Sequence, residues 1–591
     1  MHDRANLAIA GIAAALGVVL VATANRYGFH RDELYFIEAG HHLAWGYVDQ
    51  PPLTPLLGHI SQAVFGSSPR ALRVPSVLAG MGRRVASARV SIAVAPRSRG
   101  ARARAVSTAA VHPAELALGV AVVLWIVVFG TLVWRRHELY GTIDFDLGIH
   151  DQSIWQLAHG HWFTTVRGLP IFGHHATFGY FLLVPFYWLG AGPQFIDLLQ
   201  VVVLALGAIP IFVLARDRLT SQWAALVPAL VWLLQPSVQW FAWETFHPEV
   251  IAIVAVLCAY LAAERNRIGA YWVFVFLAII WKEDLALLFI GLGLLYLLRK
   301  RWRLGAATIA VGTIWFAAFA MVMVPHLAGG RTVYGPLYGK LGDSPGEVAK
   351  TAVTDPGAVA SRLKQNGAGS YGVELMAPMA FTPLAAPGLL LLGAPQAIVN
   401  LLSTANFTWD VRYHYAALPV VALALGMVEG IGAIDRWLRR KRMASGRWVV
   451  LAVTLGFAVF ATHAWGPSPV SERYHDGYWP AADGGIDAAA KSAAVARIPN
   501  GAGVSADYNL VPHLAHRQLI YTFPNPWISS NYGVDGTEHP DPGAVQWLAI
   551  NTFLLDLPSR TLLDSLVSSG QFVVDSYEDG VMVAHRVKPP A

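Results

Sequence analysis

Apolar runs as long as membrane-spanning helices recur through the chain. One of them, Ala114–Trp134, has about twenty residues, enough to cross the hydrocarbon core of a bilayer as a helix. Of the 591 residues, 55% are hydrophobic and only 14% are charged. Because so few charges cannot solvate so much apolar surface, the sequence predicts a polytopic, all-α membrane protein rather than a soluble one.

We expect about eleven core membrane helices after residue 113, and one more near the N-terminus at Asn6–Ala24. The segment Ala176–Leu189 is expected to lie at the membrane surface as an amphipathic helix. Besides Ala114–Trp134, the predicted core spans are Phe195–Ala215, Gln222–Trp240, Val250–Ala263, Tyr271–Trp281, Leu285–Leu298, Leu304–Pro325, Val373–Ala385, Pro387–Leu402, Ala416–Ile434 and Trp448–Ala464.

Charge is segregated between the predicted loops. Basic clusters such as Arg299–Arg303 and Arg436–Arg442 are typical of cytoplasmic loops, so the net charge of +6 does not call for a nucleic-acid partner. The loops rich in acidic residues and histidine then fall on the opposite side of the plasma membrane. These outer loops are Asp144–His175, Glu244–Glu249, Lys282–Asp284, Pro325–Tyr371 and Ser403–Tyr415.

Two acidic loops with the same spacing suggest a duplicated opening unit. Asp32 stands fourteen residues before Gly46, and Asp146 stands fourteen residues before Gly160. We interpret residues 1–80 as a truncated copy of this unit, a membrane helix followed by an acidic outer loop. An Arg-rich linker, residues 81–112, joins it to a complete membrane domain, residues 113–465.

The last part of the chain, residues 466–591, differs from the rest. Val504–Ala506, Gln518–Tyr521 and Trp547–Asn551 have the composition of short strands. Phe572–Ser576 and Val581–His585 flank a turn and predict a hairpin. We expect a small α/β domain outside the cytoplasm. It has no disulfide, because the only cysteine of the chain is Cys258 in an apolar run.

Carboxylates gather directly after the run Ala114–Trp134. Asp144 and Asp146, two residues apart, could share a divalent cation such as Mg²⁺ or Mn²⁺, or handle a proton. Asp151 follows on the same loop. Acidic residues at the end of a membrane helix are costly unless they face water, a partner or a substrate, so the alternative is a solvated acidic loop.

Three further clusters of ionisable residues interrupt apolar runs on the predicted outer side, and substrate binding is one interpretation of each. The clusters are His247 with Glu249, then Lys282, Glu283 and Asp284, and last Arg412, His414 and Tyr415. The alternative is a capped helix start for the first cluster, an internal ion pair for the second and an interfacial anchor for the third. The arginine of the third cluster could clamp a phosphate with two hydrogen bonds.

Two families resemble this chain. The stretch RDELYFIEAGHHLAWGYVDQPPLTPLL resembles the first outer loop of membrane glycosyltransferases related to protein O-mannosyltransferases and the lipid A aminoarabinose transferase (family 39), over about residues 5–80. From about residue 114 to the end, the motifs FDLGIHDQ, FHPE, KEDLALL, RYHY and NLVPHLAHR resemble a bacterial membrane-protein family, domain of unknown function 2079. Both groups are similar to the GT-C superfamily.

The resemblance implies a GT-C-like fold and a polyprenyl-phosphate sugar donor used on the outer membrane face. In the mannosyltransferase-like group the acidic pair that begins the first outer loop holds the catalytic base. Asp146 matches that position, with Asp144 or Asp151 assisting, whereas Asp32 matches it in the truncated copy and is expected to be idle.

We therefore expect a membrane glycosyltransferase that acts on an envelope glycan, lipid or protein. No Walker motif occurs, which argues against direct nucleotide use, and there is no GxSxG elbow or HExxH motif. A transporter or flippase for a lipid-linked sugar and a catalytically inactive membrane scaffold are the alternatives. Transporters often have inverted repeats with a site at the midplane, whereas this chain has a tandem repeat and charges at one face.

Overall fold

Two compact units make up the chain, Met1–Val111 and His112–Ala591. The computed structural model describes residues 28–42, 53–65, 68–69, 72–73, 76, 112–330, 335–480, 488–529 and 541–588. In the first unit, α2 (Arg31–His41) packs on α3 (Leu53–Phe65), and Arg73 pairs with Glu33 at 2.6 Å. The predicted N-terminal membrane helix at Asn6–Ala24 and most of the Arg-rich linker lie outside the described residues.

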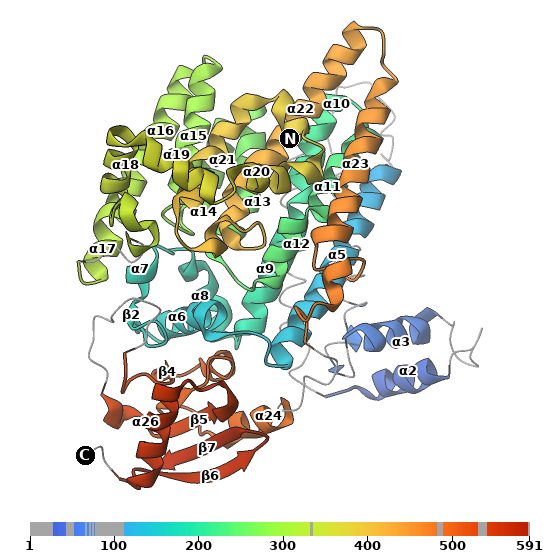
Figure 1. Ribbon diagram of the computed structural model, residues 1–591. Helices are drawn as coiled ribbons and strands as arrows, with labels where there is room; N and C mark the ends of the chain where they lie inside the picture. Colours follow the sequence, from blue (N-terminus) through green and yellow to red (C-terminus); the bar gives the residue numbers. More distant parts are fainter. Residues whose placement is uncertain are drawn as a thin grey trace, which may run out of the picture. The chain divides into compact units, whose positions relative to one another are not determined.

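Apolar helices of membrane-spanning length dominate the second unit (Figure 1). Five described segments pass by length and composition, and a sixth passes if a pair of helices bent by 45° is counted as one span. The five are α5 (Pro113–Glu138), α9 with α10 (Pro193–Leu206 and Ala208–Leu219), α16 to α17 (Trp302–Leu327), α22 (Ala417–Arg440) and α23 (Gly446–Trp465). The bent pair is α11 (Gln222–Leu234) with α12 (Pro236–Trp243).

Several predicted spans are helices too short to cross a bilayer alone. They are α14 (Ile268–Ile279), α15 (Leu285–Leu298) and α21 (Leu390–Leu402), whereas α13 (Pro248–Glu264), with 17 residues, is at the lower limit of a span. Lys282, Glu283 and Asp284 separate α14 from α15, and a 3₁₀ turn, Pro387–Leu389, directly precedes α21. Among the described residues, five or six segments are therefore long enough to span, fewer than the eleven expected from apolar runs.

The predicted span Val373–Ala385 does not form a continuous helix. The helix α20 (Ala368–Met376) ends within it, and two 3₁₀ turns follow, each with a proline near its start. Ala380 and Phe381 between the turns adopt left-handed backbone conformations, with φ of 47° and 56°. Proline lacks the amide hydrogen that a continuing helix needs, which explains the break in an otherwise apolar segment.

The helix α22 is the most buried of the long spans, with 89% of its apolar window inside the protein. It contacts α10, α13, α21 and α23. A Cβ at Gly430 would collide with the carbonyl oxygen of Thr382, so glycine is required where the broken segment crosses α22. Figure 1 shows α22 among these helices.

Ion pairs join the ends of α10, α13 and α15 to the middle of α22. Glu429 is buried, Arg218 and Glu264 are half-buried, and Arg299 is exposed. The guanidinium of Arg218 binds both carboxylate oxygens of Glu429, at 2.9 and 2.8 Å. It also pairs with Glu264, which accepts a second hydrogen bond, of 2.9 Å, from Arg299. Charges inside an apolar helical protein are tolerated when they are paired in this way.

Short helices connect the long spans. The acidic loop leads into α6 (Ile149–Ala158), a two-stranded antiparallel sheet of β1 (Phe163–Thr164) and β2 (Leu169–Pro170), and then α7 (Ile171–His174) and α8 (Tyr180–Trp188). Within the segment Ala176–Leu189, expected to be an amphipathic helix, α8 covers only Tyr180–Trp188 and is apolar or aromatic on all sides, so it is not amphipathic. It exposes Phe181, Leu182 and Trp188. Two more helices, α18 (Pro345–Thr354) and α19 (Pro356–Gln365), follow α17.

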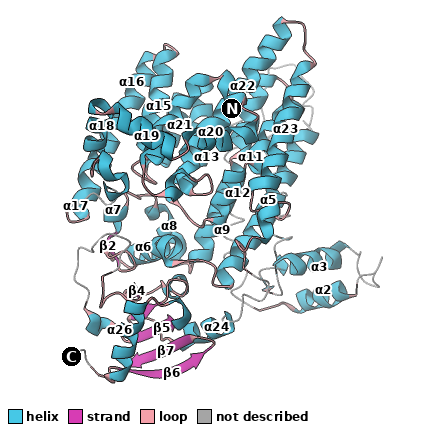
Figure 2. Ribbon diagram, in the orientation of Figure 1, coloured by secondary structure: helices cyan, strands magenta, loops and turns pink. Residues whose placement is uncertain are grey.

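A five-stranded sheet forms the C-terminal part, and the described strands outside β1 and β2 are confined to it (Figure 2). The order is β4-β3-β5-β7-β6, with β3 parallel to β4 and β5, and β7 antiparallel to β5 and β6. The strands are β3 (Val504–Ala506), β4 (Ile520–Thr522), β5 (Trp547–Asn551), β6 (Phe572–Glu578) and β7 (Val581–Arg586), with helices α24 (Ala488–Arg497), α25 (Val511–Leu514) and α26 (Leu557–Ser568). The predicted strands and hairpin are confirmed.

This sheet shares its core with the loop that carries the acidic residues. Tyr140, Ile149 and Val166 pack in one buried cluster with residues of β3, β4, β5 and β7. Thr165 Oγ1 donates to the Ile520 carbonyl (2.6 Å) and accepts from the Ile520 amide (3.1 Å). The acidic loop is therefore held by the C-terminal sheet as well as by the membrane helices.

We expect the contact between the C-terminal sheet and the acidic loop to weaken as the pH rises, because His516 loses its positive charge. Its Nε2 lies 3.2 Å from Asp151 Oδ1. Burial lowers the pKa of His516, but the facing carboxylate raises it more, so the pKa lies above the usual 6.5. A histidine whose pKa is raised by folding contributes its full stabilisation at a pH below the pKa that it has in the unfolded chain. That stabilisation is lost as the pH rises through the pKa that it has in the folded protein.

Hydrogen exchange of β4 and α6, compared between pH 6 and pH 8.5 after correction for intrinsic rates, measures the effect. Wild-type protection should fall with pH, whereas His516→Gln should remove this dependence. The exposed His463 serves as a control, and His463→Gln should behave like wild type. An equal pH dependence in wild type and His516→Gln would refute the assignment.

Candidate functional site

Asp146 lies in a tight turn between α5 and α6. The chain leaves α5 through Tyr140, whose φ is +57°, and then forms one π-helical turn at Asp144–Gly148. His137 Nδ1 lies 2.9 Å from Thr142 Oγ1 and fixes the exit from α5. Single π-helical turns are frequent at functional sites because they change the direction of side chains within a helix.

Asp146 faces a pair of stacked imidazoles. Its Oδ1 lies 3.4 Å from His247 Nε2, and the His247 ring stacks on His414 with 3.7 Å between ring centroids. His414 Nδ1 in turn lies 2.7 Å from Glu244 Oε1. The residues come from the turn before α6, the end of α12, the start of α13 and the start of α22, so four elements build the site.

A second group of charges continues from this pair. Glu249, in the first turn of α13, lies 3.7 Å from His414 Nε2 and 2.5 Å from Lys282 Nζ. Lys282 also lies 3.6 Å from Asp284 Oδ2. The sequence-predicted residues His247, Glu249, Lys282 and His414 are therefore brought together with Asp146.

Glu283 and Tyr415 lie at the edge of this cluster. Glu283 Oε1 lies 2.7 Å from His175 Nδ1, and its Oε2 accepts a hydrogen bond from the Ala176 amide at 2.9 Å. The Tyr415 ring lies 4.0 Å from the His414 ring and 6.0 Å from Lys282 Nζ. These contacts connect the cluster to the segment before α8.

The other predicted residues have different partners. Asp144 Oδ2 accepts a hydrogen bond of 2.6 Å from Thr522 in β4, and Asp151 Oδ1 accepts one of 2.7 Å from Tyr187. Arg412 binds Asp410, with 2.6 Å between Nη2 and Oδ2, and donates to Tyr478. Positions two apart on a helix do not face each other, which explains why Asp144 and Asp146 point to different neighbours.

The charge state of Asp146 suits a base. Burial raises the pKa of Asp146, but the neighbouring imidazoles of His247, His414 and His150 lower it more, and the net pKa lies below its usual value. The carboxylate is therefore ionised at neutral pH and able to accept a proton. Its side chain remains 21% exposed, so a substrate can reach it.

One set of described residues has the geometry of a metal site. Ligand atoms of Glu244, His247 and His414 all lie within 4.8 Å of one another. His247 Nε2 is buried without a hydrogen-bond partner among the described residues. Two imidazoles and one carboxylate fit Zn²⁺ or Mn²⁺ better than Mg²⁺, which prefers oxygen ligands. The set differs from the pair Asp144 and Asp146 expected from the sequence.

Two histidines of the site were not predicted to belong to it. His175 lies at the end of the expected outer loop and binds Glu283. His150 lies between Asp146 and Asp151, and its ring is 5.9 Å from that of His247, with Nδ1 2.5 Å from Tyr180 Oη. The signal in the sequence was the density of histidine on the predicted outer side, but the pairing depends on contacts between distant segments.

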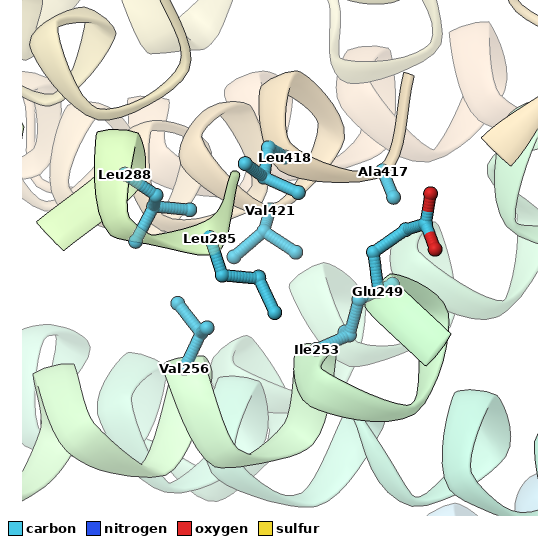
Figure 3. A pocket seen from close by; sticks show the side chains of 8 residues that line it. All are labelled: Glu249, Ile253, Val256, Leu285, Leu288, Ala417, Leu418 and Val421. Carbon is cyan, nitrogen blue, oxygen red and sulfur yellow. The ribbon is translucent and has the colours of Figure 1, made fainter. Parts of the chain in front are cut away.

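A small apolar pocket opens beside the charged cluster. Glu249 stands at one end of it, and side chains from α13, α15 and α22 line the rest (Figure 3). The apolar lining residues are Ile253, Val256, Leu285, Leu288, Ala417, Leu418 and Val421. A charged cluster and an apolar surface therefore adjoin at the ends of these helices.

The fold and this cluster define an integral membrane protein with a buried ionisable site at the ends of its helices. The chain belongs to the family of predicted membrane proteins termed DUF2079, whose model matches residues 136–583. No curated protein is similar to it in sequence.

Among solved structures, the chain is similar to ArnT from Cupriavidus metallidurans, determined with undecaprenyl phosphate bound and in the apo state. The TM-score is 0.46 for both. Sequence identity is 16% and 15%, over 80% of this chain and 97% and 99% of the ArnT chains. A likeness at this level does not determine an activity.

We expect the purified protein to bind one divalent transition-metal ion at Glu244, His247 and His414. Metal content after equilibration with Zn²⁺ or Mn²⁺ measures this directly. Removing one ligand, as in His247→Ala or His414→Ala, should weaken binding by at least roughly tenfold. The exposed His326 provides the control, and His326→Ala should retain the metal. Equal metal content in wild type and both ligand variants would exclude the site.

Proposed function

We propose that this protein is an integral-membrane glycosyltransferase that moves a sugar from a polyprenyl-phosphate donor to an envelope glycan, lipid or protein. The observation that carries the proposal is the ionised, partly exposed Asp146 beside His247 in a cluster of buried ionisable groups at the helix ends. The resemblance of residues 5–80 to mannosyltransferase-like enzymes, together with the fourteen-residue spacing to glycine that Asp146 shares with Asp32, supports the same reaction.

In the proposed reaction Asp146 is the general base. It takes the proton of an acceptor hydroxyl as the acceptor oxygen forms a bond to C1 of the sugar. The bond between C1 and the phosphate oxygen breaks, and its electron pair leaves with the polyprenyl phosphate. A bound metal at Glu244, His247 and His414 would supply Lewis-acid stabilisation of negative charge. His247 Nε2 lies 3.4 Å from Asp146 Oδ1, so such a metal would lie next to the proposed base.

The charges of the cluster suit a phosphate-bearing donor. Lys282 supplies positive charge for a phosphate, although Glu249 neutralises much of it. The pocket beside Glu249 is lined by apolar side chains (Figure 3), but it leaves no room for a water molecule, so a hydrocarbon chain would have to lie elsewhere along the membrane helices.

The proposed orientation puts the site outside the cytoplasm. Arg299 to Arg303 and Arg436 to Arg442 lie in basic loops, which are favoured on the cytoplasmic side. The C-terminal sheet, which holds Asp144 through Thr522, is then also outside. Such a placement gives the enzyme access to envelope acceptors.

Asp146→Asn should reduce sugar transfer by about a hundred- to ten-thousand-fold, because an amide cannot accept the acceptor proton. Transfer from labelled polyprenyl-phosphate sugars is measured in vesicles that contain the purified protein. Asp564→Asn, on the exposed face of α26, is the matched control and should be fully active. Near-normal transfer by Asp146→Asn would contradict the assignment of Asp146 as general base. Movement of the donor across the bilayer without sugar transfer would favour a flippase.

Removing residues 1–105 should leave most of the transfer activity, because the cluster around Asp146 lies in the second unit, His112–Ala591. For the same reason Asp32→Ala should not change the rate of sugar transfer. The assay is the same, with membrane insertion measured in parallel. Loss of transfer in protein that still inserts normally would mean that the first acidic loop belongs to the working site.

A further inference from the structure

Arg136 is a buried cation at the end of α5 that the proposed chemistry has not yet used. It lies in the last turn of that helix, eight residues before Asp144, and is 8% exposed. Its guanidinium lies 4.0 Å from the centroid of the Trp243 ring. One of its Nη1 hydrogens is donated to the Trp243 carbonyl oxygen.

The other cations of the site are neutralised by close carboxylates. Lys282 lies 2.5 Å from Glu249, and Arg412 binds Asp410 through both Nε and Nη2. In contrast, within the described part of the chain no carboxylate oxygen lies within the 4.0 Å of an ion pair with Arg136. The positive charge of Arg136 is therefore the least compensated one near Asp146.

The electrostatic environment places Arg136 in the same site. Three acidic residues act on it at longer range, Asp197 most strongly and then Asp146 and Glu244. A guanidinium has five N–H donors in a planar fork and stays charged, so burying it beside one carbonyl leaves most of its capacity unused. Such a group is costly unless a ligand supplies the missing anion.

The position of Arg136 also departs from the general charge pattern. The basic clusters of this chain gather in loops at the predicted cytoplasmic ends, whereas Arg136, like Lys282 and Arg412, lies on the predicted outer side, eight residues before Asp144. Trp243 holds the flat face of its guanidinium, which restricts the fork to one plane. A planar, oriented fork is the geometry that binds two oxygens of one phosphate.

We propose that Arg136 binds the phosphate of the polyprenyl-phosphate donor and of the leaving polyprenyl phosphate, an assignment that rests on the proposed function. When the bond between C1 and the phosphate oxygen breaks, the bonding pair stays on that oxygen and the phosphate gains one negative charge. The fixed guanidinium offsets this charge where it develops. Arg136 thereby contacts the leaving group, while Asp146 contacts the acceptor.

The test separates phosphate recognition from sugar transfer. Binding of farnesyl phosphate and of farnesol to the full-length protein is measured side by side, for wild type, Arg136→Gln, Arg136→Lys and Arg135→Gln. Arg135 is the exposed neighbour in the same helical turn and serves as the matched control. The loss of a charge-assisted, two-point contact corresponds to roughly ten- to a hundred-fold in affinity.

We expect Arg136→Gln to weaken the binding of farnesyl phosphate by that factor and to leave the binding of farnesol unchanged. Arg136→Lys keeps the charge but lacks the fork, so its affinity for farnesyl phosphate should be intermediate. Arg135→Gln should match wild type with both ligands. If Arg136→Gln fails to insert, the comparison of Arg136→Lys with wild type decides the question on its own.

Unchanged affinity for farnesyl phosphate in the Arg136 variants overturns the inference. An equal loss of affinity for farnesyl phosphate and farnesol also overturns it, as does a wild-type protein that binds the two ligands equally well. If wild type transfers sugar and the Arg136 variants bind farnesyl phosphate normally, only this inference fails. If binding depends on Arg136 but wild type transfers no sugar from any polyprenyl-phosphate donor, the proposed function fails and the anion site stands.

Discussion

The pairing of buried charges is the constraint on which the membrane part of this structure depends. Lys282 and Glu249 join the loop before α15 to the first turn of α13, in a buried cluster where either charge alone would be unstable. Breaking such a pair on one side typically costs about 3–5 kcal/mol. A second pair, the half-buried Arg218 and the buried Glu429, joins α10 to the middle of α22. Charges therefore fix how these short apolar helices are arranged.

Much of the architecture could be predicted from local patterns. Apolar runs located the long helices, and strand composition located Val504–Ala506 and Trp547–Asn551 at the bounds that the structure has. The failure at Val373–Ala385 has a local cause as well, because Pro378 and Pro383 break a segment that is apolar enough to span. Apolarity predicts burial, whereas helix continuity also needs the backbone donors.

The candidate site was only partly predictable for a different reason. Glu244 and His414 lie 170 residues apart, and nothing local to either segment indicates that their side chains meet. Density of ionisable residues on one side of the membrane identified the right loops. It could not tell that Asp146 would face His247 while Asp144 would face Thr522, because a single turn of helix decides between them.

The shared core between the acidic loop and the C-terminal sheet has a consequence for how such proteins diverge. Ile149 and Val166 pack against Val504, Ile520 and other strand residues as one cluster, so neither side can change size independently. A chimera that joins the membrane part of one family member to the sheet of another would place mismatched side chains directly beneath the acidic turn. The two parts are therefore expected to be inherited together, with substitutions on one side matched by substitutions on the other.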